Sequence, residues 1–482
     1  MISGAELAQE AEQNRIKILP LPAARGVIYD SSGKILARNT PQGREYSLKE
    51  AAAHLIGFVG EADQSELETF TVSLGSLIGK MGIEREEDKY LRGRDGGVIM
   101  ETDSQGETVR EMSRQEPISG RDLYLFLDHH LQQAAFSALD GKKGAVVAAT
   151  PEGEVLALVS SPSFDPNLFT SQLEETKIGK VLNDPDQSMF NRVIGGQYPP
   201  GSVFKLVTAV AGLEIGVIKP REEIEDTGEI KVGEFRYGNW YFDQYGKKEG
   251  MVDMVKAIRR SNDIYFYRVG ERLGVTKLAA WARAFGLGSL TKIPLKGETA
   301  GLVPDKEWKQ AAKGESWYLG DTYITAIGQG DLQMTPIQVN QMTGVVAAGG
   351  KLCQPRLVND KRGERCERLP IEKSTLDIVK EGMKQACQPG GTGWPLFQFQ
   401  INNENYFRNA SDSADIVRIP VACKTGTAEY GDPDDKTHAW FTAFAPVENP
   451  EIVVTILLEG AGGGADKAAP VAKDILEAWF EK

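Results

Sequence analysis

Cysteine and histidine are scarce in this 482-residue chain, with four of each. The cysteines are too few for a disulfide scaffold and lack the paired C-x-x-C spacing of a structural zinc site, and the histidines form no H-E-x-x-H pair. We therefore expect no bound metal. Cys353 and Cys366 are close enough in sequence to bridge a hairpin outside the cytoplasm, but two free buried thiols explain them equally well.

Long apolar runs and an excess of positive charge are also lacking. No stretch approaches the roughly 18 apolar residues of a membrane-spanning helix, and Met1 is followed by a largely polar run instead of a signal peptide, so the chain as given is expected to be soluble. Lys and Arg total 55 against 68 Asp and Glu, a net charge of −13, which argues against nucleic acid as a partner. The length predicts two to four globular domains.

The N-terminal part of the chain combines a β-hairpin with a segment of weak pattern. Residues 16–22 are predicted to be extended, and residues 25–30 and 35–37 flank a Ser-Ser-Gly-Lys turn that is typical of a hairpin. Residues 40–120 are predicted to be irregular and polar. We place a domain boundary near residues 117–120, which gives domains of residues 1–120 and 121–482.

The C-terminal part predicts a sheet assembled from both of its ends. β-Rich runs occupy residues 144–150, 154–160, 419–428, 438–445 and 452–459, and a terminal helix is predicted over 468–480. Strands at both ends of a largely helical region imply an α+β fold, with one five-stranded antiparallel sheet, flanking helices and an inserted helical lobe.

A serine and a lysine are three residues apart at the start of a predicted apolar helix over residues 202–216. At that spacing Ser202 and Lys205 share a helix face. Apolar surroundings would lower the pKa of Lys205 and allow it to act as a base toward Ser202. By itself the pair is weak evidence, because an N-capping serine followed by a lysine with its head in solvent is commoner.

Two further motifs strengthen this interpretation. Ser261-Asn262-Asp263 lies between two helical stretches, where an ordinary helix cap would also explain it. Lys424-Thr425-Gly426-Thr427 lies in a predicted strand, where an exposed Lys-Thr pair on an edge strand is the alternative. A glycine within a strand often marks close approach of a ligand backbone. Strand alternation places Lys424 and Gly426 on one face, and Cys423 on the other as a packed, buried thiol.

In this order and spacing the three motifs resemble those of the serine acyl-transferases that react with penicillin. The resemblance covers most of residues 121–482, including Tyr198-Pro199-Pro200-Gly201, Gly328-Gln329-Gly330 before Thr335-Pro336, and His438-Ala439-Trp440-Phe441. Residues 25–37 look like the start of the pedestal of class B penicillin-binding proteins. The chain thus resembles a class B peptidoglycan D,D-transpeptidase, more of the elongation than of the division type, with a shortened, β-rich, partner-binding (dimerisation-type) pedestal over residues 1–120 and the transpeptidase domain over 121–482.

The resemblance implies a role for each motif residue. Ser202 would be the nucleophile, Lys205 its base and Ser261 a proton relay. Lys424 would tune the local charge and Asp263 would hold the hydrogen-bond network. The substrate-binding strand would use Thr425 and Thr427 for the terminal carboxylate and Gly426 for close approach, with the oxyanion between the backbone N–H groups of Ser202 and Thr427. No cofactor is expected.

The same resemblance implies the partners and the location. Peptidoglycan stem peptides and β-lactam antibiotics would bind the catalytic domain, and a membrane glycosyltransferase would be a partner at the extracytoplasmic face of the bacterial cell membrane. Family members carry a membrane anchor, so the native form is expected to be membrane-anchored, although we recognise no anchor segment in the sequence as given. A serine β-lactamase or β-lactam sensor is one alternative, which would not need the first 120 residues. A non-catalytic cell-wall scaffold is another, which would have no chemical reason to keep all four catalytic residues.

Overall fold

The computed structural model describes residues 16–67, 72, 76–103, 107–170, 175–360, 363, 365–401 and 417–482. The chain folds as two compact units. The first comprises Met1–Leu125 and Asp165–Lys180, and the second comprises Phe126–Phe164 and Val181–Lys482. The sequence pattern placed a boundary at residues 117–120 and did not indicate that residues 165–180 return to the first unit.

The second unit is built around a five-stranded antiparallel sheet in the order β11-β10-β22-β21-β20. Its strands are β10 (Gly144–Ala149), β11 (Val155–Ser161), β20 (Ala422–Glu429), β21 (Thr437–Ala445) and β22 (Ile452–Leu458). The prediction of one antiparallel sheet in an α+β fold is therefore confirmed. Because β10 pairs with β22, the two ends of the unit close a single sheet, and β20 lies at its edge.

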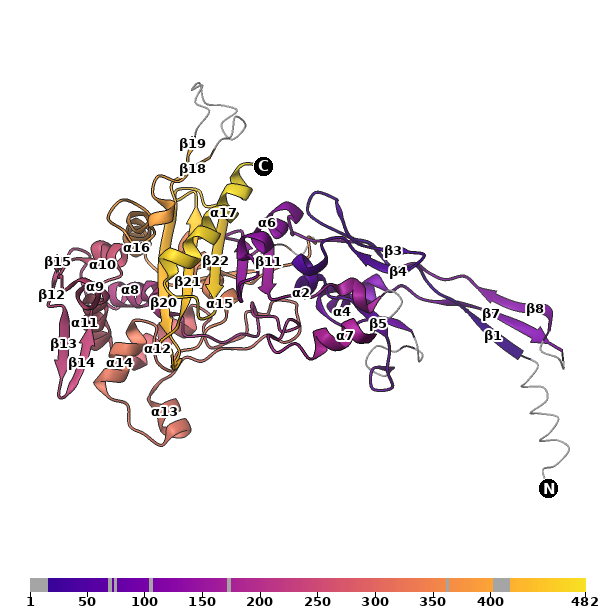
Figure 1. The fold of residues 1–482 in the computed structure, drawn as a ribbon, viewed down its shortest axis with the longest axis horizontal. Helices are drawn as coiled ribbons and strands as arrows, with labels where there is room; N and C mark the ends of the chain where they lie inside the picture. The colour runs from indigo at the N-terminus through magenta and orange to yellow at the C-terminus, as the bar shows by residue number, and fades with distance from the viewer. Residues whose placement is uncertain are drawn as a thin grey trace. The chain divides into compact units, whose positions relative to one another are not determined.

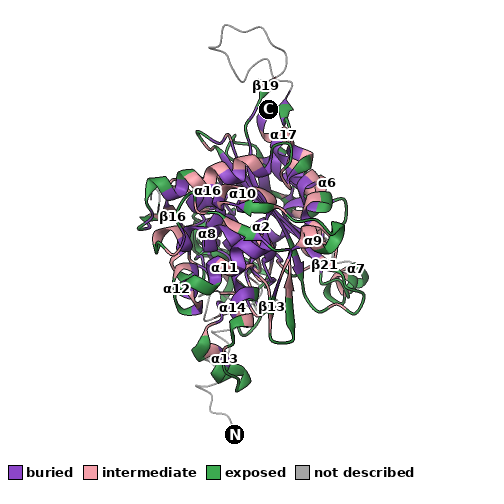
Figure 2. Ribbon diagram, turned by 90° about the vertical axis from the view of Figure 1, so that its left-hand side faces the viewer, coloured by how far each residue is buried: buried purple, intermediate pink, exposed green. Residues whose placement is uncertain are grey.

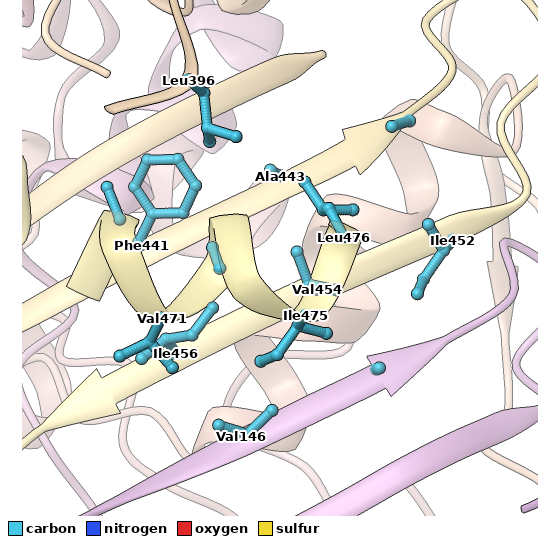
Figure 3. Packing of buried hydrophobic residues seen from close by; sticks show 14 of the residues in the cluster. Val146, Leu396, Phe441, Ala443, Ile452, Val454, Ile456, Val471, Ile475 and Leu476 are labelled. Atoms are coloured by element: carbon cyan, nitrogen blue, oxygen red, sulfur yellow. The ribbon is translucent and has the colours of Figure 1, made fainter. Parts of the chain in front are cut away.

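Helices α6 (His129–Leu139) and α17 (Ala469–Phe480) cover one face of the sheet, and Figure 1 shows α17 lying across the C-terminal strands. Alternate residues of the strands supply this apolar layer, as expected from the period of two along a strand. In Figure 3, Val471 and Ile475 of α17 lie beside Ile456 and Val454 of β22, and Val146 of β10 continues the cluster. This layer makes the sheet a firm base for residues on its other side.

The opposite face packs against helix α15 (Pro336–Ala347) through a row of hydrogen-bonded polar groups. The hydroxyl groups of Thr343 and Thr442 are 2.8 Å apart, and those of Thr442 and Thr455 are 2.9 Å apart. Asn340 donates from Nδ2 to the carbonyl oxygen of Val453 at 3.0 Å. Each of these buried polar groups has a partner, so the layer fixes the position of α15 without the penalty of unpaired groups.

A helical lobe is inserted between the N- and C-terminal strands of the sheet. Figure 2 shows its helix α8 (Lys205–Glu214) almost wholly buried, whereas α13 (Lys306–Lys313) is largely exposed. The other elements of the second unit are η3 (Gly201–Phe204), β12 (Ile224–Asp226), β13 (Glu229–Val232), β14 (Phe235–Gly238), α9 (Trp240–Tyr245), β15 (Gly250–Val252), α10 (Met254–Arg260), α11 (Asp263–Leu273), α12 (Val275–Ala284), α14 (Leu319–Ala326), β16 (Lys351–Cys353), β17 (Cys366–Arg368), α16 (Lys373–Ala386), η4 (Trp394–Leu396), β18 (Gln400–Ile401), β19 (Val417–Arg418) and η5 (Gly464–Ala468).

The first unit contains the predicted hairpin, formed by β2 (Ile28–Tyr29) and β3 (Ile35–Thr40), and the predicted extended segment, β1 (Ile16–Leu21). Its other elements are β4 (Gly43–Tyr46), η1 (Lys49–Ala52), α2 (Ala53–Ile56), β5 (Val59–Glu61), β6 (Leu77–Gly79), α4 (Gly82–Glu86), α5 (Asp88–Leu91), β7 (Gly96–Thr102), β8 (Thr108–Gln115), β9 (Leu123–Tyr124) and η2 (Pro166–Phe169), and α7 (Glu175–Leu182) spans the unit boundary.

The prediction that residues 40–120 are irregular was wrong. Strands β7 and β8 pair with each other, and β1 pairs with β7, to form a three-stranded antiparallel sheet. Every residue of β8 is exposed, so neither face of the strand carries the apolar alternation by which a half-buried strand is recognised. Its strand identity rests on backbone pairing, which leaves little trace in hydropathy.

A buried cluster of charges holds the first unit together. Arg25 donates to Glu84 at 2.6 Å and to Asp88 at 2.8 Å, and Arg44 donates to the other oxygen of Glu84 at 2.7 Å. Gly26 beside it is required by space, because a Cβ there would lie 2.0 Å from the carbonyl oxygen of Arg121. The Arg-Gly pair at the start of the hairpin is thus explained by one buried ion network and one close approach of backbones.

All four cysteines are disulfide-bonded, which corrects the view of Cys423 as a free thiol and settles the choice for Cys353. Cys353 and Cys366 are directly opposite in the hairpin of β16 and β17 and form one bond. Cys387, at the end of α16, and Cys423 of β20 form the other. The second bond joins residues 36 positions apart, a pairing that sequence spacing did not suggest. Across the described residues, no helix is both long and apolar enough to cross a bilayer.

Candidate active site

Ser202 lies in the 3₁₀ turn η3, and the α-helix α8 begins at Lys205, so the helix predicted from residue 202 starts three residues later. In a 3₁₀ turn, residues i and i+3 lie on the same side, which keeps Ser202 in line with Lys205. Trp440 of β21 donates from Nε1 to the carbonyl oxygen of Pro199 at 2.9 Å. This hydrogen bond fixes the segment just before Ser202 against the sheet.

Lys205 is fully buried, and its ammonium group is surrounded by residues of the second motif. Its Nζ donates to Asp263 Oδ1 at 2.6 Å and to the carbonyl oxygen of Ser261 at 2.8 Å, and lies 3.3 Å from Ser261 Oγ. Burial lowers the pKa of Lys205 below its usual value, although the carboxylate of Asp263 opposes that shift. The amine is thus easier to deprotonate than an exposed lysine.

Lys424 reaches the same serine from the other side. Its Nζ donates to Ser261 Oγ at 2.8 Å and to the carbonyl oxygen of Thr425 at 2.9 Å. Burial and the neighbouring charge of Lys205 hold the pKa of Lys424 well below its usual value. The hydroxyl of Ser261 therefore lies between two amines, which is the geometry a proton relay requires.

Ser261 occupies a strained position between helices α10 and α11. Its φ of 52° is in the left-handed region, which is uncommon for a residue other than glycine and is often found at functional sites. Asn262 caps α11 by accepting a hydrogen bond from the backbone N–H of Tyr265, and Ser261 is the C-cap residue of α10, so the motif caps two helices in addition to holding the two lysines. Asn262 also donates to Asp226 at 3.1 Å, which ties the motif to a buried carboxylate.

The strand β20 brings the third motif alongside the serine turn. A Cβ at Gly426 would lie 2.9 Å from Trp440 Cβ and 3.1 Å from the carbonyl oxygen of Pro200, so this glycine lets the turn pack onto the strand. Thr425 is buried, and its hydroxyl donates to Thr392 Oγ1 at 2.8 Å. Thr427 is exposed. Of the two threonines, the structure leaves the side chain of Thr427 accessible to a ligand.

The backbone of Thr427 faces the free edge of β20. Its carbonyl oxygen accepts a hydrogen bond from Gln329 Nε2 at 3.1 Å, which lies outside the sheet ladder. In an antiparallel strand the N–H and C=O of one residue point to the same side, so the N–H of Thr427 also points to that edge. A Cβ at Gly201 would lie 2.6 Å from the carbonyl oxygen of Thr427, which places the residue before Ser202 directly against this strand.

Several residues that shape the site carried no recognisable role in the sequence. Gln329 and Trp440 lie in segments that resemble the family but whose sequence assigned no role to either residue. Thr392 lies in a Gly-Gly-Thr-Gly segment that is typical of an ordinary loop. Tyr198 donates to Glu459 at 2.6 Å and anchors the start of the serine segment. These contacts join residues more than 30 positions apart, and only the fold brings them together.

The arrangement suits acyl transfer by a serine. It combines a half-buried Ser202, two buried lysines of lowered pKa, a bridging hydroxyl and a strand edge with an outward N–H group. Among the described residues, no cluster of three or more His, Cys, Asp or Glu side chains could hold a metal ion.

Comparison with known families identifies both parts of the chain. The penicillin-binding protein transpeptidase domain matches residues 144–477, and the penicillin-binding protein dimerisation domain matches residues 40–125. The peptidoglycan D,D-transpeptidase MrdA of Haemophilus influenzae is 31% identical, over 97% of this chain and 86% of that protein. The similarity therefore extends over nearly the whole length of this chain.

Solved structures show the same fold. Pseudomonas aeruginosa PBP2 in complex with WCK 5153 is 34% identical, with a TM-score of 0.81 and 97% of each chain covered. Helicobacter pylori PBP2 in a complex with MreC is 27% identical, with a TM-score of 0.81, covering 95% of this chain and 98% of that one.

Proposed function

The chain belongs to the penicillin-binding protein transpeptidases and is a serine-type peptidoglycan D,D-transpeptidase, and we propose that Ser202 is the nucleophile with which it cross-links stem peptides. The observation that carries this assignment is the convergence of Lys205, Ser261 and Lys424 through hydrogen bonds of 3.3 Å or less at the turn that bears Ser202. Lys205, Ser261 and Lys424 therefore form one hydrogen-bonded group, and Lys205 directly follows the turn that bears Ser202.

In the first half-reaction Ser202 Oγ forms a bond to the carbonyl carbon of the penultimate D-Ala of a stem peptide. Lys205, whose pKa is lowered by burial, accepts the hydroxyl proton. The peptide bond to the terminal D-Ala then breaks, and the leaving amine takes a proton through Ser261, which Lys424 holds at 2.8 Å. Asp263 keeps Lys205 in place through the hydrogen bond that Lys205 Nζ donates to its Oδ1 at 2.6 Å.

The strand edge of β20 would bind the substrate during this step. The N–H groups of Ser202 and Thr427 stabilise the oxyanion, where loss of one donor costs roughly 3 to 4 kcal/mol in such enzymes. Thr427 binds the terminal carboxylate through its exposed hydroxyl. The resemblance also implies a carboxylate contact for Thr425, but its buried hydroxyl donates to Thr392, so we assign Thr425 to holding the strand, and Gly426 allows the backbone of the substrate to approach.

In the second half-reaction the amine of a neighbouring stem peptide attacks the ester carbon of the acyl-enzyme. A new peptide bond forms, the bond to Ser202 Oγ breaks and the serine recovers its proton from Lys205. The attacking amine gives up a proton through Ser261, which replaces the proton that the leaving amine took in the first half-reaction. The net reaction exchanges one peptide bond for another, so no cofactor is needed.

A labelled penicillin tests the assignment, because a β-lactam mimics the D-Ala-D-Ala terminus. We expect a one-to-one adduct on Ser202 that persists for many minutes, and no adduct on Ser202→Ala, with circular dichroism showing that the variant is folded. Intact-mass measurement over time follows the adduct. Rapid return to the unmodified mass would indicate a β-lactamase instead, and a lack of any adduct on the unaltered protein would indicate a scaffold.

We further propose that the protein acts in elongation of the cell wall at the extracytoplasmic face of the bacterial membrane. The Ser-x-Asp form of the second motif and the similarity to MrdA and PBP2 proteins support the elongation role. Two disulfides support the location, because such bonds persist in oxidising compartments. The PBP2–MreC complex of Helicobacter pylori supports a partner-binding role, which we assign to the first unit, and a membrane glycosyltransferase is proposed as a second partner.

A further inference from the structure

The side chain of Gln329 binds the free edge of β20, the strand that carries Lys424, as a residue of a sixth strand would. Its Nε2 donates to the carbonyl oxygen of Thr427 at 3.1 Å, and its Oε1 accepts from the backbone N–H of Glu429 at 3.2 Å. An amide that donates to one strand residue and accepts from the next outward-facing one copies the bonding of a neighbouring strand. The side chain thus occupies the edge of β20 between the carbonyl group of Thr427 and the N–H of Glu429, next to the outward N–H of Thr427.

The residue before Gln329 binds the turn that carries the nucleophile. Gly328 accepts a hydrogen bond at its carbonyl oxygen from the N–H of Gly201 at 2.7 Å. Gly328 has a φ of 81°, and a Cβ there would lie 2.0 Å from the carbonyl oxygen of Gly201. Only glycine fits this crossing of backbones. One two-residue segment therefore contacts the serine turn through its backbone and the catalytic strand through its side chain.

Each of these two contacts lies next to one of the two N–H groups proposed to bind the oxyanion. The N–H of Ser202 follows Gly201 directly, and the N–H of Thr427 shares its residue with the carbonyl group that Gln329 binds. An oxyanion site works only when both donors are held in place before charge develops, because moving them during the reaction would cost the stabilisation they provide.

We propose that Gln329 is a positioning residue that fixes the spacing of the two oxyanion donors by joining the strand β20 to the turn η3. The proposal rests on the proposed roles of Ser202 and Thr427. Gln329 acts through the backbone and takes no part in proton transfer. Its loss slows the acylation step and leaves the initial non-covalent binding of the substrate largely unchanged.

The test measures acylation by a fluorescent penicillin in the full-length chain, with the dissociation constant of the initial complex and the acylation rate constant separated by stopped flow. Gln329→Ala is expected to lower the rate constant by about five- to a hundredfold, below the 10²- to 10³-fold loss that follows outright removal of a donor. The dissociation constant should change by less than about threefold. The matched control is Gln341→Ala in α15. It removes a similar hydrogen bond, which the side-chain amide donates from Nε2 to the carbonyl oxygen of Cys353 at 2.9 Å.

A second variant separates positioning from loss of packing. Gln329→Glu keeps the size of the side chain and the acceptor for Glu429, but a carboxylate cannot donate to Thr427. Once protonated at low pH, the carboxylic acid can donate again, so the rate ratio of the unaltered protein to Gln329→Glu should shrink as the pH falls. This variant also replaces Gln329→Ala if the latter does not fold.

The proposal is overturned if Gln329→Ala acylates within twofold of the unaltered protein, if the loss lies in initial binding, or if Gln341→Ala slows acylation as much. It is also overturned if the deficit of Gln329→Glu does not depend on pH. Failure of the proposed function looks different, since the unaltered protein would then form no adduct on Ser202.

Discussion

Removal of the Cys387–Cys423 disulfide is expected to affect both the stability and the acylation rate, whereas removal of Cys353–Cys366 should affect stability alone. The two bonds close loops of 36 and 13 residues. On the loop-entropy model, paired serine substitutions then lower the free energy of unfolding by about 3.8 and about 2.9 kcal/mol respectively. The stability losses are similar enough for one pair to serve as the control of the other.

The acylation rates of the two paired variants should differ, because only the Cys387–Cys423 bond lies next to the loop that contacts β20. A Cβ at Gly393 would lie 2.5 Å from Cys423 Sγ, so the longer-range bond supports the loop that carries Thr392. Thr392 accepts the hydrogen bond of Thr425, next to Lys424. If the loop relaxes and that bond is lost, at about 0.5–1.5 kcal/mol, acylation slows by about two- to twelvefold, since 1.36 kcal/mol is tenfold in rate.

Stability and rate can be measured on the same unit of the protein. All seven tryptophans lie at residue 240 or beyond, within the second unit that also contains both disulfides, so tryptophan fluorescence during urea unfolding reports on that unit alone. Thiol titration of the denatured protein should find no free thiol before reduction and four after it. Equal acylation rates for the two paired variants would refute the link between the disulfide and the catalytic strand, and free thiols before reduction would refute its premise.

Two further perturbations test the charge networks. Asp263→Asn removes the carboxylate that raises the pKa of Lys205, so the neutral amine should persist to lower pH. The acid limb of the pH profile of the acylation rate should therefore move to lower pH, as measured by stopped flow. A move to higher pH would contradict this reasoning. Glu84→Ala leaves Arg25 and Arg44 buried without their shared carboxylate and should lower the free energy of unfolding of the first unit by about 3–5 kcal/mol, measured by hydrogen exchange; a loss below about 1 kcal/mol would count against the network.

The sequence predicted the elements whose signal is local, and it missed those that depend on pairing across the fold. The strands of the five-stranded sheet are mostly buried β-rich runs, so hydropathy marks them, and the serine, Ser-x-Asp and Lys-Thr-Gly motifs carry their chemistry in short segments. Strand β8 is exposed along its whole length and shows no alternation. The Cys387–Cys423 bond depends on α16 ending beside β20, which no spacing reveals.

The sequence of the second motif shows which side chains are present, but it does not show which charged groups those side chains contact. A Ser-x-Asp sequence shows that a carboxylate is present, but its effect depends on which amine it reaches. The structure pairs Asp263 with Lys205 and leaves Lys424 with Ser261 Oγ and a backbone carbonyl. One lysine thus has a counter-charge that opposes the effect of burial, and the other lacks that direct contact. Ser261 lies between them, so the two amines of the proposed relay lie in different electrostatic environments.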